Sequence, residues 1–204
     1  QSGKKNKEVL IMRYPIGVQD FEKIIEGNYV YVDKTDLVYE LTKENVCFLS
    51  RPRRFGKSLL ISTLDAYFKG KKELFEGLKI ADLEKEWVEY PVFRIDFARG
   101  NYNKEGTLEA RIDGFITEWE SVYGKNPFSS EITDRFYYVL KQAEEKTGHK
   151  AVVLIDEYDK PLLDPLGEEQ EIVNRNILRS FYGTFKSADS HLRFVLLTGV
   201  TKFS

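Results

Sequence analysis

The sequence predicts an α/β fold in which a mostly parallel sheet carries helices on both faces. Short apolar runs, which are typical of strands, alternate with longer segments whose apolar residues recur at helical spacing. The run at 151–155 is apolar throughout, which indicates a parallel strand covered by helices on both sides. These two observations place the chain among the α/β proteins.

The residues ahead of the core predict smaller elements. Asp20 is suited to cap a short helix that carries Phe21 and Ile24. The run at 29–32 alternates Tyr and Val, which predicts a short strand. Asp33 follows this run in the position of an N-cap for the next helix.

Four strands are expected in the core, and each is a short apolar run with β-branched or aromatic residues. They are Val46–Ser50, 92–97, 151–155 and 194–197. The segments between them carry apolar residues at helical spacing, with a more polar helical stretch at 71–90. The helices are expected over 60–68, 71–90, 108–122, 132–143 and 173–188.

Composition excludes several classes of protein. The chain has 204 residues, 42% of them apolar, and a net charge of −2, which excludes a disordered, collagen-like or coiled-coil chain. Cys47 is the single cysteine, so neither an intrachain disulfide nor a cysteine-based zinc site is expected. No segment approaches the roughly 20 apolar residues that span a bilayer. We therefore expect a cytoplasmic protein that makes no membrane contact.

The strongest motif lies directly after the first core strand. Gly56, Lys57 and Ser58 match the second half of the phosphate-binding pattern G-x-x-x-x-G-K-[ST], while Arg51 stands at the first glycine. Lys57 would reach the β- and γ-phosphates, and Ser58 would ligate Mg²⁺. The expected nucleotide-binding residues are Arg51, Pro52, Arg53, Arg54, Phe55, Gly56, Lys57, Ser58 and Leu59. A basic loop beside a helix start is the alternative that this motif alone leaves open.

A second motif follows the apolar strand at 151–155. Asp156 would hold Mg²⁺ through water, and Glu157 would polarise the attacking water as general base. Because ligands of open α/β sheets bind at the carboxyl ends of strands, both motifs are expected to face one crevice. Two exposed acids at the end of a buried strand are the alternative.

Other polar residues are weaker candidates. Thr198 ends the last strand and is a candidate sensor of the γ-phosphate, with an ordinary strand-end role as the alternative. Asp159 and Lys160 are expected to pair with each other or to orient the site. Arg175 and Arg179 are candidates for an arginine finger, against surface ion pairing. The two histidines lack partners at ligand spacing, so a His-based metal site is not expected.

Six segments together carry a resemblance that covers nearly the whole chain, namely 15–17, 20–21, 31–35, 51–58, 156–161 and 198–200. On these segments the chain resembles the bacterial predicted AAA-ATPase family, also called AAA-ATPase-like. That resemblance implies a P-loop NTPase three-layer sandwich of the additional-strand, catalytic-Glu type. It also implies ATP and Mg²⁺ as ligands, with Lys57 and Ser58 at the phosphates and metal, and Asp156 and Glu157 at metal and water. The Arg-Pro-Arg-Arg-Phe-Gly-Lys-Ser loop is the usual form in this family, which accounts for Arg51.

The expected function is an ATP-binding and ATP-hydrolysing module that drives or regulates an attached effector. The resemblance implies a nuclease-like domain further along in the full-length protein, and an oligomer is left open. The alternative is a non-hydrolysing nucleotide- or nucleic-acid-binding module, in which Arg51, Arg53 and Arg54 contact a DNA phosphate. A small-molecule nucleotide kinase is less favoured, because no segment supplies a clear lid or acceptor site.

The expected domain organisation has three parts. Residues 1–3 are typical of the remnant of a cleaved expression tag, residues 8–45 form an N-terminal segment, and residues 46–204 form the ATPase core. The implied class has five core parallel strands, with the phosphate loop after the first and the sensor after the fourth. Since four strands are assigned, we expect the core to be truncated before the fifth.

Overall fold

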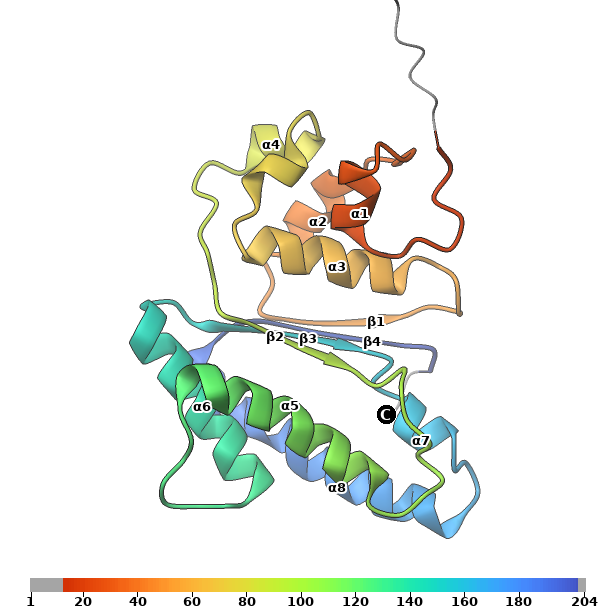
Figure 1. The fold of residues 1–204 in the computed structure, drawn as a ribbon, viewed down its shortest axis with the longest axis vertical. Helices are drawn as coiled ribbons and strands as arrows, with labels where there is room; N and C mark the ends of the chain where they lie inside the picture. Colours follow the sequence, from red (N-terminus) through yellow and green to blue (C-terminus); the bar gives the residue numbers. More distant parts are fainter. Residues whose placement is uncertain (1–12, 202–204) are drawn as a thin grey trace, which may run out of the picture.

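The computed structural model describes residues 13–201 and shows a single four-stranded sheet between two layers of helices (Figure 1). All neighbouring strands are parallel, in the order β1-β4-β3-β2. The strands are β1 (Val46–Ser50), β2 (Val92–Asp96), β3 (Ala151–Asp156) and β4 (Leu192–Gly199). The predicted parallel α/β architecture is therefore confirmed, and β4 lies between the strands that precede the two motifs.

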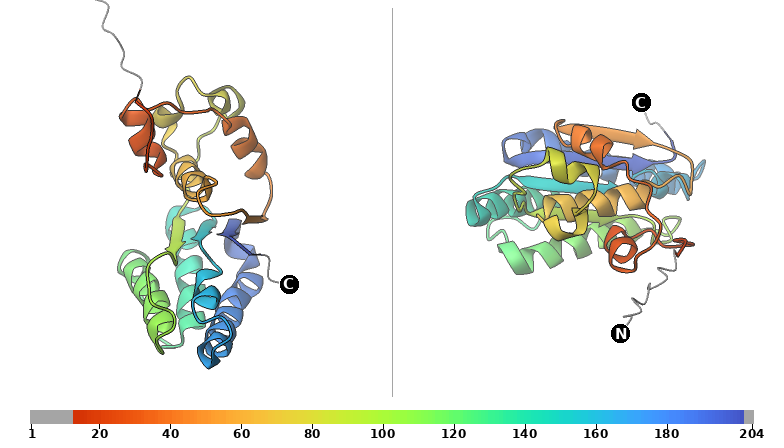
Figure 2. Two further views of the ribbon diagram at one scale, coloured as in Figure 1. Left: turned by 90° about the vertical axis from the view of Figure 1, so that its right-hand side faces the viewer. Right: turned by 90° about the horizontal axis from the view of Figure 1, so that it is seen from above.

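Helices cover both faces of this sheet, as two further views show (Figure 2). One layer holds α1 (Phe21–Glu26), α2 (Thr35–Leu41), α3 (Lys57–Phe68), the 3₁₀ turn η1 (Lys72–Phe75) and α4 (Lys79–Leu83). The other layer holds α5 (Thr107–Tyr123), α6 (Ile132–Thr147) and α8 (Glu169–Ser187). Two short elements, α7 (Lys160–Leu163) and η2 (Asp189–His191), flank α8. None of the helices within residues 13–201 is long and apolar enough to cross a membrane.

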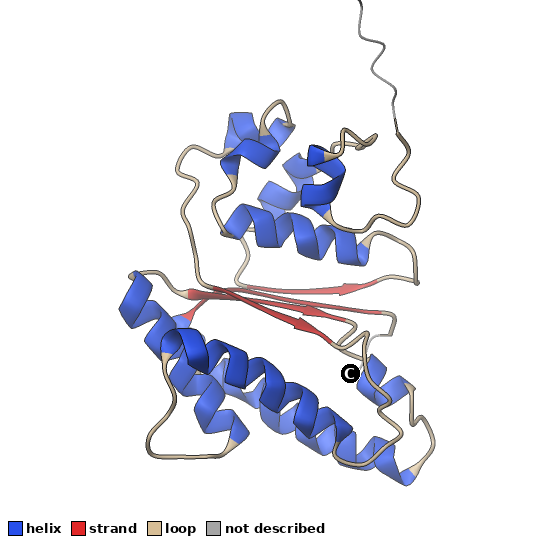
Figure 3. Cartoon of the chain, in the orientation of Figure 1, coloured by secondary structure: helices blue, strands red, loops and turns tan. Residues whose placement is uncertain are grey.

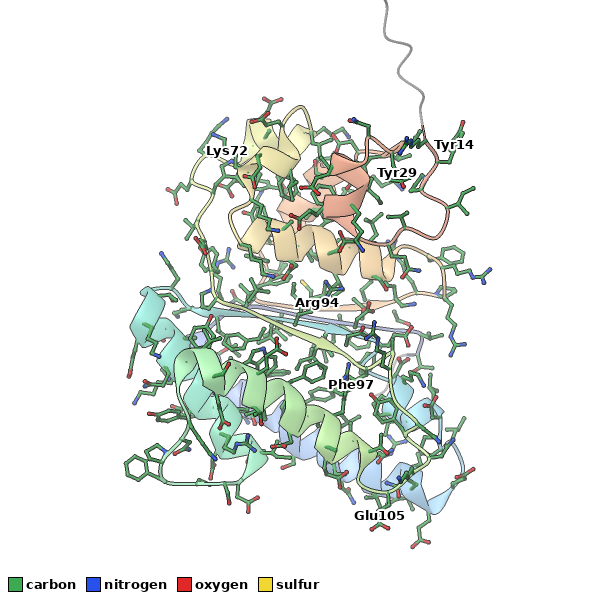
Figure 4. All side chains as sticks on the ribbon, viewed as in Figure 1. Tyr14, Tyr29, Lys72, Arg94, Phe97 and Glu105 are labelled. Atoms are coloured by element: carbon green, nitrogen blue, oxygen red, sulfur yellow. The ribbon has the colours of Figure 1, made fainter. Side chains whose placement is uncertain are left out.

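The side chains of strand β2 alternate between the two faces of the sheet. Phe93 and Ile95 are fully buried and pack with the helices of the α5 layer. Figure 4 shows Arg94 on the α3 side of the sheet, and Phe97 on the α5 side. Because successive side chains of a strand point to opposite faces, Asp96 shares the face of Arg94. This alternation places Arg94 and Asp96 on the α3 side of the sheet, where α3 follows the phosphate loop.

Strand β1 occupies an edge of the sheet and is less covered than the others. All residues of β3 are buried, whereas Val46 and Phe48 of β1 are 64% and 45% exposed. Among the described residues, β1 pairs with β4 alone. The apolar character of β1 in the sequence therefore does not reflect complete burial in this structure.

Two expected elements differ from the structure (Figure 3). The strand expected at 29–32 is wrong, because only Tyr29 makes a bridge, to Arg13, and the following residues are irregular. The helix expected over 71–90 is also wrong, since this segment holds only the short elements η1 and α4. Its apolar residues fold over α3 instead, where Phe75 packs against Phe21 with ring centroids 4.8 Å apart.

Of the two expected N-caps, Asp20 is confirmed and Asp33 is wrong by one residue. Asp20 caps α1, and its side chain accepts a hydrogen bond from the Lys23 amide at 3.0 Å. The N-cap of α2 is Lys34 rather than Asp33, but Asp33 still accepts from the Thr35 amide at 2.9 Å. The expected tag remnant at residues 1–3 lies outside the described residues.

Candidate functional site

The phosphate-binding pattern forms a loop between β1 and α3, as its sequence predicts. Left-handed backbone conformations occur at Arg54 (φ 66°) and Gly56 (φ 76°), whereas Arg51 has no positive φ. The Arg51 amide donates to the carbonyl oxygen of Gly199 at 3.0 Å. A glycine is thus not required at position 51, because this loop turns at residues 54 and 56. Residues 51–56 are all exposed.

The N-terminus of α3 presents unbonded amides at the end of this loop. The first intrahelical bond runs from the Leu60 amide to the Gly56 carbonyl, and no described side chain caps the helix. The amides of Lys57, Ser58 and Leu59 therefore lack helical acceptors and are suited to bind an anion. The site has the hydrogen-bond donors that a phosphate group requires.

Lys57 lies across the loop rather than in solvent. Its side chain is buried, and Nζ donates to the carbonyl oxygens of Arg51 at 2.9 Å and Pro52 at 3.1 Å. These two bonds hold the ammonium group under the loop while its charge has no carboxylate partner among the described residues. A buried cation without a counter-ion is costly, so a bound phosphate would compensate a charge that the described chain leaves unpaired.

Asp156 ends the buried strand β3 and is itself only 4% exposed. Its Oδ1 atom accepts from the Thr198 hydroxyl at 2.7 Å and from the Glu157 amide at 3.0 Å. Oδ1 accepts both hydrogen bonds, and no described residue donates to Oδ2. Thr198 is fully buried and holds Asp156 in this geometry; its role as a phosphate sensor stays a prediction.

Glu157 has a left-handed backbone conformation, with φ of 53°. This conformation is uncommon for a residue other than glycine and marks positions that the surrounding structure must hold. Burial raises the pKa of its carboxyl group, and the charge of Asp156 raises it further. The positive charges of Arg53 and Lys57 act on this pKa in the opposite direction. A raised pKa suits a general base that must accept a proton near neutral pH.

A cavity of about 390 Å³ joins the two motifs. Its lining includes Ser58 from the start of α3, and Asp156 and Glu157 from the end of β3. The expectation that both motifs face one crevice is therefore confirmed at these residues. The cavity continues to the N-terminal segment, where residues 17–20 and Lys23 form its far wall.

Sequence reasoning missed two residues of β2 that line the same cavity, Arg94 and Asp96. Asp96 lies beside Asp156 in the register of β2 and β3, and its Oδ1 accepts from the Ala98 amide at 2.8 Å. Arg94 forms no ion pair with a described residue. The signal was available, because Asp96 ends a parallel strand as Asp156 does, and ligands bind at that edge.

The other candidates lie outside this cavity. Arg175 pairs with Glu171 on α8, as the ion-pairing alternative predicts, and Arg179 is exposed. Lys160 pairs with Asp164, so it does not pair with Asp159. Within residues 13–201, no group of three or more His, Cys, Asp or Glu side chains is arranged to hold a metal ion by itself. Magnesium bound with a nucleotide commonly takes one or two protein ligands and completes its shell with phosphate and water. Ser58 and Asp156 fit that requirement.

Comparisons with known proteins show the family of this chain. The family model described as "Predicted AAA-ATPase" matches residues 15–204. A protein of Azotobacter chroococcum mcd 1, described as an uncharacterized protein in the vnfD 5' region, is 43% identical over 196 residues. The alignment covers 94% of this chain but 38% of that relative, so the chain spans less than half of its length. No solved structure gives a significant match.

The family match covers both motifs, the N-terminal wall of the cavity and the end of β4. It confirms the resemblance based on the phosphate loop and the Asp156–Glu157 pair. This chain belongs to the predicted AAA-ATPase family.

Proposed function

We propose that the protein is a Mg²⁺-dependent module that binds and hydrolyses ATP. The observation that carries this proposal is the cavity that brings Ser58, Asp156 and Glu157 together beside the open N-terminus of α3. The position of β4 between β1 and β3 supports the additional-strand, catalytic-Glu type of P-loop NTPase, since one strand separates the two motif-bearing strands.

Each side chain has a distinct role in this proposal. The amides at the start of α3 and the ammonium group of Lys57 bind the phosphates. Ser58 and Asp156 hold Mg²⁺, which neutralises charge on the phosphates when it is bound. Glu157 accepts a proton from the water that attacks the γ-phosphate. The hydrogen bonds from Thr198 and from the Glu157 amide orient the Asp156 carboxylate. They also hold Asp156 in a fixed position relative to Glu157.

Control of an attached effector belongs to the same proposal. It is supported by the greater length of the Azotobacter relative, of which this chain covers 38%. The same proposal includes a nuclease-like effector, a cytoplasmic location and assembly into an oligomer.

Isothermal titration with ATP and Mg²⁺ tests the binding step. Wild-type protein should bind, and Lys57→Ala should weaken the affinity at least about tenfold, because a charge-assisted contact to phosphate is lost. Lys69→Ala is the matched control, since Lys69 lies just beyond the other end of α3 and pairs with Asp65. Absence of wild-type binding, or equal affinities for the wild type and Lys57→Ala, would refute the proposal.

Phosphate release under saturating ATP tests the chemical step. Glu157→Gln should lower kcat about 100-fold or more while ATP affinity is retained, because general base catalysis contributes factors of this size. Glu105→Gln is the control, since Glu105 is exposed at the far end of the α5 layer (Figure 4). An unchanged kcat in Glu157→Gln would remove Glu157 from the mechanism.

The nucleic-acid alternative makes a different prediction. If Arg51, Arg53 and Arg54 contact DNA phosphates, duplex DNA should bind with an affinity that falls steeply with salt, and ATP should displace it. The exposure of all three arginines is compatible with either ligand. The burial of Lys57, and the cavity that Ser58, Asp156 and Glu157 line together, favour ATP and Mg²⁺.

A further inference from the structure

Asp159, two residues after the proposed general base, is a buried carboxylate that accepts three hydrogen bonds on one oxygen. Its Oδ2 atom accepts from the amides of Val200 and Thr201, both at 2.7 Å, and from the Thr201 hydroxyl at 2.9 Å. The residue is 1% exposed and forms no ion pair with a described cation. All three donors belong to the segment that directly follows Thr198.

Further bonds join the same two segments. The Tyr158 amide donates to the Thr198 carbonyl oxygen at 3.0 Å, and the Tyr158 hydroxyl donates to the Thr201 carbonyl oxygen at 2.7 Å. Gly199 lies so close to Tyr158 that a Cβ atom there would be 2.3 Å from the Tyr158 ring. Residues 158–159 and 198–201 thus form one tightly connected unit, which we call the 159–201 junction.

The opposite side of this junction contacts the beginning of the phosphate loop. The Arg51 amide donates to the Gly199 carbonyl oxygen at 3.0 Å, and the Ser50 hydroxyl donates to the Val200 carbonyl oxygen at 3.0 Å. The short segment 199–201 therefore bonds the phosphate loop on one side and the residues after Glu157 on the other. A displacement of the phosphate loop would therefore reach Asp159 through Gly199 and Val200.

Glu157 needs such support, because its left-handed backbone conformation is unfavourable for a residue with a side chain. Its amide is held by Asp156, and its neighbour Tyr158 is held by Thr198. Asp159 anchors the following turn, whose Lys160 amide donates to the Glu157 carbonyl oxygen at 3.0 Å. Hydrogen bonds to β3 on one side and to the junction on the other therefore hold the backbone of Glu157 in this conformation.

We infer that Asp159 is a positioning residue for Glu157, and that the 159–201 junction couples the phosphate loop to the general base. This inference rests on the proposed function, since it assigns Asp159 a role in the same hydrolysis reaction. Asp159 touches neither nucleotide nor water in this scheme. It acts by holding the turn that aims the Glu157 carboxylate, and a small misplacement of a catalytic group can reduce a rate by about 100-fold.

The experiment compares Asp159→Ala with Asp159→Asn, measuring kcat and the ATP dissociation constant separately. Asp159→Ala should lower kcat about 10- to 100-fold with ATP affinity changed less than about threefold. Asp159→Asn should recover part of the rate, because an amide oxygen can still accept from the same donors. Asp164→Ala is the matched control: it removes the pair with Lys160 beside α7 and leaves the junction intact, so kcat should be unchanged.

A double mutant separates positioning from general destabilisation. In the Glu157→Gln background, Asp159→Ala should have little further effect on kcat, because residues that act as a unit are non-additive. If Asp159→Ala does not fold, Thr201→Val replaces it, since this change removes one donor and keeps both amides. Thr201→Val should then lower kcat several-fold with affinity retained.

Three outcomes overturn the inference. One is a kcat of Asp159→Ala within about twofold of wild type. Another is an equal loss of ATP affinity and rate, which a purely structural role would cause. The third is full additivity with Glu157→Gln. In each case wild-type hydrolysis leaves the proposed function standing, whereas an inactive wild type would refute both together.

Discussion

Gly199 provides a direct test of how tightly the junction is packed. An alanine there would place its Cβ 2.3 Å from Cε1 and 2.6 Å from Cδ1 of Tyr158, and 2.8 Å from Cγ of Asp159. Contacts this short require the neighbours to move. The Tyr158 ring is 5% exposed, packs edge-on against Phe48 and is tied to Thr201 by its hydroxyl, so it cannot move freely.

These contacts determine the expected magnitude. Overpacking a filled site costs about 1–3 kcal/mol, and loss of the Tyr158 hydrogen bond adds about 1 kcal/mol. Gly199→Ala should therefore lower the free energy of unfolding by about 3 kcal/mol. Gly183→Ala is the matched control, because Gly183 lies within α8 and a Cβ atom added there would meet nothing within 4 Å apart from its chain neighbours and the nearby backbone of α8. That substitution should stabilise the protein by about 0.5–1 kcal/mol.

Urea unfolding followed by circular dichroism measures both variants against the wild type. The two variants should differ by about 3–4 kcal/mol at equal m-value, or by roughly 10 °C in Tm for a domain of this size. A Gly199→Ala protein within about 0.5 kcal/mol of wild type would refute the close packing of the junction.

Three further predictions concern charged groups. Glu157→Gln should raise the Tm of the nucleotide-free protein more at pH 8 than at pH 4. Burial raises the pKa of Glu157, so the contribution of this carboxyl group to stability is lost as pH rises through its folded-state pKa, and glutamine does not ionise. An equal shift of Tm at both pH values would contradict this. Arg94→Gln should weaken ATP binding about tenfold and ADP binding less, by titration, if the guanidinium faces the terminal phosphate, whereas the exposed control Arg99→Gln should bind both normally. Arg135→Ala should destabilise the fold by about 3–5 kcal/mol in urea unfolding, because it leaves the buried Glu120 carboxylate unpaired, and a loss below about 1 kcal/mol would contradict the importance of that pair.

The four core strands could be predicted from local sequence because each is a short apolar run. The structure of segment 71–90 could not be predicted in this way. Its apolar residues Phe75 and Trp87 do not mark one face of a helix; they pack over α3 from η1 and from the loop before β2. Periodicity records that a side chain is buried and does not record which neighbour buries it. The same limit explains 29–32, where Tyr31 packs against Phe21 and has no strand partner among the described residues.

At the candidate site, the phosphate loop and the Asp156–Glu157 pair could be recognised because each is a contiguous motif. Arg94 and Asp96 were missed because they are separated from both motifs by more than 35 residues in the chain and join them only through the register of β2 with β3. The role of Thr198 likewise depends on β4 lying beside β3, which places its hydroxyl 2.7 Å from Asp156.

Residue types and local spacing are sufficient to indicate an α/β chain with a phosphate-binding loop and an acidic pair at a strand end. Strand order is a property of the folded chain, and it decides which loops meet. With β4 between β1 and β3, residues 198–201 can bond the phosphate loop on one side and Asp159 on the other. Those bonds join residues more than 40 positions apart, so no local pattern specifies them, and they depend on the packing of the whole sheet.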